Sequence, residues 1–75
     1  MNDADADTDF DKADIILADA LQRFQADGVS PYVYGMALME IGIAALINVG
    51  EDAGEIAEQA RHIAERVAPA LRGPR

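Results

Sequence analysis

The sequence contains no cysteine and no tryptophan, only four other aromatic residues, three prolines and a single histidine. The absence of cysteine excludes disulfide bonds and thiolate metal ligands. The opening stretch, MNDADADTDF, has neither the basic segment nor the apolar segment of a secretory signal. We therefore expect a cytoplasmic protein.

Basic residues are also scarce. The 75 residues include 14 Asp and Glu but only 6 Lys and Arg, which gives a formal net charge of −8. A protein that neutralises nucleic-acid phosphates usually carries the opposite sign of charge. The composition thus predicts no direct nucleic-acid binding and favours a basic protein as any partner.

Residues for nucleophilic catalysis are few. Apart from the tyrosines, Thr8 and Ser30 are the only residues with a hydroxyl group, and Ser30 is expected to cap a helix. No glycine-rich phosphate loop follows a strand pattern. We expect no enzyme activity and no cofactor.

The composition favours an all-α fold, because alanine is abundant and β-branched residues do not alternate with polar ones. Apolar spacing predicts one domain of three helices, at about residues 9–25, 31–48 and 52–71. Residues 1–8 are predicted to form a disordered acidic leader, and residues 72–75 a frayed tail. Pro69 is expected to kink or end the third helix, since it cannot donate a backbone hydrogen bond.

The connections between the helices carry the most specific local signals. Gly28 and Gly50 are suited to end the first two helices, since glycine adopts positive φ without steric cost. Ser30 followed by Pro31 is typical of a helix start, as is Asp52 with Glu55 three residues later.

The predicted central helix is apolar on all sides and contains one charged residue, Glu40. A membrane span is disfavoured because this charge lies near the middle and Lys and Arg do not flank the segment. A lone three-helix bundle would leave a large apolar patch in water. We therefore expect a homodimer about a twofold axis, with the candidate interface formed by Tyr34, Gly35, Leu38, Met39, Gly42, Ala45, Leu46 and Val49.

Gly35 and Gly42 lie seven residues apart and so share one face of the central helix. Small residues at this spacing allow another helix to approach closely. That neighbour belongs either to a second copy of the chain or to the same chain, and the sequence leaves both alternatives open.

The helix order, Pro31 at the start of the middle helix and Leu46-Ile47-Asn48 at its end are similar to the YejL-like family of small bacterial proteins. The resemblance covers roughly residues 14–71. It implies a helical homodimer and no known chemistry.

Two candidate sites involve charged residues. Glu40 is a candidate buried acid, either functional or placed at the dimer edge beside an arginine or a tyrosine hydroxyl. His62, with Glu58 and Glu65 near it, has the spacing of metal ligands but is expected to be solvated. Alternating Asp residues at the start of the chain are similar to a calcium loop, yet Thr8 stands where that loop requires glycine. We predict no metal site.

The sequence as a whole predicts an acidic helical homodimer that acts as a protein–protein interaction module. The alternative is a protein that binds a small apolar ligand between its helices, near Tyr34, Met36 and Met39.

Overall fold

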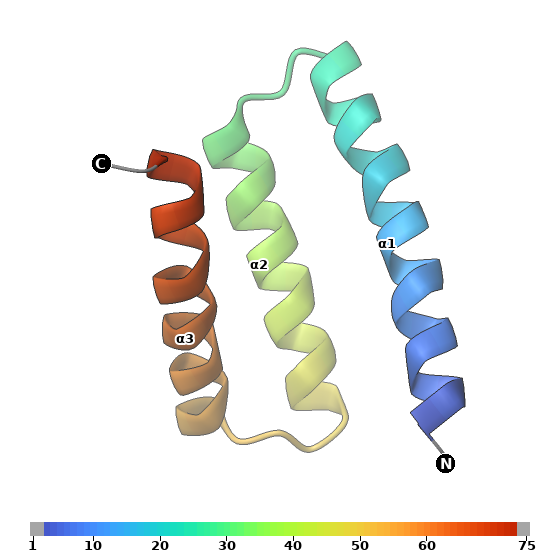
Figure 1. The fold of residues 1–75 in the computed structure, drawn as a ribbon, viewed down its shortest axis with the longest axis vertical. Helices are drawn as coiled ribbons and strands as arrows, with labels where there is room; N and C mark the ends of the chain where they lie inside the picture. Colours follow the sequence, from blue (N-terminus) through green and yellow to red (C-terminus); the bar gives the residue numbers. More distant parts are fainter. Residues whose placement is uncertain (1–2, 74–75) are drawn as a thin grey trace. The chain divides into compact units, whose positions relative to one another are not determined.

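The computed structural model describes residues 3–73 of the chain, and their side chains from residue 7 onward. It contains three helices: α1 (Asp3–Ala26), α2 (Pro31–Asn48) and α3 (Ala53–Arg72). Figure 1 shows them in chain order, joined by two short connections. No strand occurs within residues 3–73. The all-α, three-helix prediction is confirmed.

Helix α1 begins earlier than the sequence predicted. Its first residue is Asp3, so residues 3–8 are helical, and Thr8 lies inside the helix. Two properties of this stretch explain the difference. Alanine has the highest helix propensity, and aspartates in the first turn interact favourably with the positive end of the helix dipole. Residues 1–2 of the predicted leader lie outside the described residues.

Backbone turns at two glycines end α1 and α2. Gly28 has φ of 74°, and the N–H of Val29 donates to the carbonyl of Phe24 at 2.9 Å. Gly50 has φ of 95°, and the N–H of the next residue donates to the carbonyl of Leu46 at 3.0 Å. Both turns are Schellman motifs, which satisfy carbonyls left unpaired at a helix end. The predicted role of both glycines is confirmed.

Side chains cap the starts of α2 and α3 as predicted. The Ser30 hydroxyl accepts from the N–H of Val33 at 3.4 Å. The Asp52 carboxylate accepts from the N–H of Glu55 at 3.1 Å. Each contact satisfies a donor that the first helical turn leaves free.

Residues up to Met36 form one compact unit, consisting of α1 and the first turns of α2. The rings of Phe24 and Tyr34 stack within it, with centroids 5.1 Å apart and planes inclined by 7°. Ala20 and Val29 are half-buried in the same unit. Apolar contacts therefore hold the first connection between two helices.

A second compact unit begins at Ala37 and comprises the rest of α2 and all of α3. Ile56, on α3, is 8% exposed and is the one buried side chain among the described residues. Ile63 and Val67 recur on the same face of α3 at helical spacing, while charged residues occupy the other face. This amphipathic pattern agrees with the predicted inward stripe of the third helix.

Pro69 lies inside α3, which ends one residue beyond the predicted bound of about residue 71. The helix continues to Arg72, and the N–H of Gly73 donates to the carbonyl of Pro69 at 3.1 Å. Proline removes one hydrogen bond, to the carbonyl of Glu65, and only three residues of helix follow it. Of the predicted frayed tail, Arg72 is helical, Gly73 is the cap, and residues 74–75 lie outside the description.

Candidate functional site

The most conspicuous surface of the chain is the apolar surface of α2. No residue of this helix is buried. Eight of its large apolar side chains are between 40% and 76% exposed: Tyr32, Val33, Met36, Met39, Ile41, Ile43, Leu46 and Ile47. Soluble proteins rarely leave so much contiguous apolar surface in water, and such patches mark interaction sites.

The predicted interface residues divide into two groups. Tyr34 and Leu38 are half-buried within the chain itself, and Tyr34 is engaged in the ring stack with Phe24. The other six are exposed: Gly35, Met39, Gly42, Ala45, Leu46 and Val49. The ring stack was not predicted, although two aromatic residues flanking a short turn are a signal that the sequence carried.

The structure bears on the open question about the two helical glycines. A Cβ atom added at Gly35 or at Gly42 would meet no atom within 4 Å. Within the unit that contains each glycine, no atom therefore approaches it closely. Crowding against the helices of its own unit does not account for either glycine.

Glu40 is exposed in the single chain. Helix geometry places it about 140° around α2 from Gly35, since each residue advances the helix by about 100°. Whether this carboxylate becomes buried depends on what covers α2, so its role as a buried acid stays a prediction.

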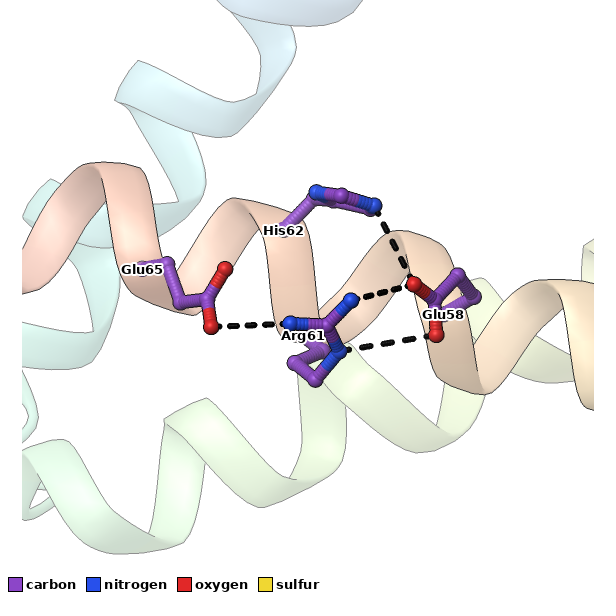
Figure 2. Close-up of polar contacts among 4 residues, drawn as sticks. All are labelled: Glu58, Arg61, His62 and Glu65. Atoms are coloured by element: carbon purple, nitrogen blue, oxygen red, sulfur yellow. Dashed lines mark hydrogen bonds and ion pairs between the residues drawn. The ribbon is translucent and has the colours of Figure 1, made fainter.

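A group of charged side chains lies along the polar face of α3 (Figure 2). Arg61 donates to Glu65 at 2.9 Å and forms a second ion pair with Glu58. The Nε2 atom of His62 lies 3.3 Å from the Glu58 carboxylate. Arg61 and Glu65 lie one turn apart on α3, and all four side chains are more than half exposed.

The hydrogen bond to Glu58 raises the pKa of Arg61 above its ordinary value, and the bond to Glu65 adds to this while desolvation opposes it. These contacts stabilise a charge that arginine carries in any case. Within the described residues, no group of three or more His, Asp or Glu side chains is placed to hold a metal ion. The cluster is therefore best described as a solvated ion-pair network on one helix.

By length and composition, α2 is the one described helix apolar enough to cross a membrane. A helix enclosed in a soluble assembly can have the same length and composition. These two properties therefore do not distinguish a membrane helix from an enclosed one. The charge pattern around α2 disfavours a membrane: Asp27 precedes it, Glu51 and Asp52 follow it, and its last turn contains no basic residue.

Comparisons with protein families, with curated proteins and with solved structures found no match to this chain. The resemblance to the YejL-like family accordingly stays a prediction from sequence.

Proposed function

We propose that this protein is a cytoplasmic helical homodimer that acts as a protein–protein interaction module and has no catalytic activity. One observation carries the proposal. The large apolar side chains of α2 are exposed, whereas Ile56 is the only described residue that the chain buries. A surface of this kind requires a partner.

Stability gives the reason for a permanent partner. Burying one isoleucine side chain contributes about 1.5–3 kcal/mol. Ordering a single residue of backbone costs about 1–2 kcal/mol, and the chain orders three helices. A second copy of the same chain is a partner that is always available in the cell. Two copies about a twofold axis would share one core of six helices.

The acidic residues of α1 indicate what the dimer binds. Asp7, Asp9, Asp11 and Asp14 are exposed along the first half of this helix. They give the surface a strong negative potential, which attracts a basic partner and repels phosphate groups. We infer a basic protein segment as the target, and neither nucleic acid nor a membrane.

Light scattering over a dilution series tests the homodimer directly. We expect twice the chain mass, persisting as the protein is diluted. A mass of one chain at every concentration would refute the dimer and redirect the search to a different partner for α2.

The test of the interaction surface uses charge reversal. Replacing Asp7, Asp9 and Asp11 by lysine should weaken binding of a Lys- and Arg-rich test peptide by more than tenfold, while the dimer mass stays unchanged. Equal binding by the variant and the original chain would count against α1 as the docking surface.

Native mass spectrometry distinguishes the proposed interaction module from the alternative function, the binding of a small apolar ligand. Two bare chains are the expected species. An additional mass that stays with the dimer after purification would favour the ligand instead.

A further inference from the structure

One face of α2 has the spacing of a helix–helix contact. Gly35, Met39, Gly42, Leu46 and Val49 recur at alternating intervals of four and three residues along this face. This alternation is the pattern by which two helices pack side chains of one into spaces of the other. We call these five residues the glycine seam.

The glycine seam is not covered by the helices of its own unit. Met39 is 45% exposed, Leu46 is 43% exposed and Val49 is 75% exposed. Both glycines open into free space, as described above. Glycine inside a helix costs about 0.5–1 kcal/mol relative to alanine, and nothing within the described chain offsets that cost.

Charge favours a second copy as the occupant. Two chains that each carry a net charge of −8 repel one another wherever their carboxylates meet. The glycine seam has no charged residue, and Glu40 lies about 140° around the helix from its centre. Two copies can therefore approach along this face without placing carboxylates against each other.

The available area is also of the required size. A large apolar side chain contributes on the order of 100 Å² when it becomes covered. The exposed large side chains on and beside the glycine seam thus offer on the order of 600 Å², against about 800 Å² per partner in a standard interface. The side chains counted are Tyr32, Met36, Met39, Ile43, Leu46 and Val49.

We propose that the glycine seam is the self-contact of the dimer: α2 of one chain packs on α2 of a second copy, and the backbones approach closely at Gly35 and Gly42. This inference rests on the proposed homodimer and specifies which face forms it. It also assigns different roles to the residues predicted from sequence, since Tyr34 and Leu38 contribute to contacts within their own chain.

The first test compares two substitutions in the full chain, Met39→Glu and Ile41→Glu. Ile41 is 69% exposed and lies about 120° around α2 from the centre of the glycine seam, so it is a matched control. Met39→Glu should raise the dimer dissociation constant more than tenfold, and Ile41→Glu less than threefold, by analytical ultracentrifugation. Equal effects of the two substitutions would overturn the assignment.

The second test is Gly42→Ala, which favours the helix and introduces a methyl group into open space in the single chain. Helical content measured by circular dichroism should be maintained. The dimer dissociation constant should nevertheless rise at least fivefold, because the methyl group separates the two backbones. A dimer dissociation constant that is unchanged or lower would overturn the close approach of the two backbones at Gly42.

The two proposals fail in different ways. If the original chain is a monomer at all concentrations, the homodimer and the glycine seam both fall. If the original chain is a dimer and neither Met39→Glu nor Gly42→Ala weakens it, the homodimer stands and only the glycine seam is refuted.

Discussion

The ring of Phe24, at the end of α1, stacks on the ring of Tyr34, in the first turn of α2, with 5.1 Å between centroids. The nearly parallel planes indicate an offset stack, which aromatic pairs prefer over a direct face-to-face arrangement. Because the two rings flank the turn at Gly28, the stack stabilises the connection from both sides.

A double-mutant cycle should measure this contact. Aromatic pairs contribute about 0.5–1.5 kcal/mol beyond the burial of their area, so Phe24→Ala and Tyr34→Ala should show coupling of that size in urea unfolding. Tyr32 is 76% exposed and supplies the control. Coupling between Phe24→Ala and Tyr32→Ala should be near zero, and equal coupling in both cycles would contradict the stack.

Gly50 should be intolerant of a side chain. Its φ of 95° lies where L-residues are strained, so Gly50→Ala should lower the free energy of unfolding by about 1–2 kcal/mol. Gly50→Asn should lower the free energy of unfolding by less, because asparagine tolerates positive φ better than alanine. Thermal unfolding of both variants checks this order of stability. If Gly50→Ala does not lower the stability, the turn can adopt another backbone conformation.

The cap of α3 should matter more than the cap of α2. Asp52→Ala removes an acceptor 3.1 Å from its donor and should cost about 1 kcal/mol. Ser30→Ala removes a longer contact, 3.4 Å, and should cost less. Asp52→Asn keeps the acceptor and is the control. Denaturant titration measures the stability lost in each variant. A larger loss for Ser30→Ala than for Asp52→Ala would contradict the prediction.

Arg61→Gln should have a small, salt-sensitive effect. Both ion pairs of Arg61 are exposed, and exposed pairs contribute little to stability. The thermal midpoint should fall by no more than about 3 °C at low salt, and this difference should shrink near 1 M salt. The control is Arg66→Gln, which removes the same charge elsewhere on α3. If its thermal midpoint falls as much as that of Arg61→Gln, the effect does not come from the ion pairs of Arg61.

The pH dependence of this network follows from the raised pKa of Arg61. A cation whose pKa is raised on folding stabilises the fold below its unfolded pKa, and the stabilisation is lost only as pH rises through the higher folded value. For arginine both pKa values lie far above neutral pH. The charge of Arg61 itself should therefore add no pH dependence between about pH 6 and 9.

The proposed dimer predicts a thermal midpoint that depends on protein concentration. Assembly stabilises only the folded state, so a hundredfold rise in concentration should add about 2.7 kcal/mol of apparent stability per dimer. Scanning calorimetry at several concentrations measures the shift. A midpoint independent of concentration would contradict a dimer whose unfolding and dissociation are coupled.

Local signals in the sequence predicted most of the fold. Positive-φ glycines, the two side-chain caps and the bounds of α2 all follow from interactions within a few residues, and such interactions are visible in the sequence. The start of α1 was less certain, because helix propensity competes with the repulsion among closely spaced aspartates. The predicted end of α3 at about residue 71 lies one residue before the observed end, since proline costs less in a last turn than in a helix interior.

The candidate site was predictable only in part. Hydropathy alone predicted that α2 is covered by a partner, but not which of its residues are already half-buried within the chain. That division requires the positions of Phe24 and Tyr34, which belong to different helices. Free space beside Gly35 and Gly42 likewise depends on tertiary structure, and no pattern within a single helix reveals it.

The scarcity of buried side chains among residues 7–73 has a consequence for the lifetime of the protein. A monomer whose most covered side chain is Ile56 spends much of its time open, and open chains are substrates for proteases. Under the proposed assembly, a newly made chain survives only if it meets another before it is degraded. Scarce copies are thus cleared quickly and abundant copies persist, so the cellular amount of this protein responds more steeply than linearly to its rate of synthesis.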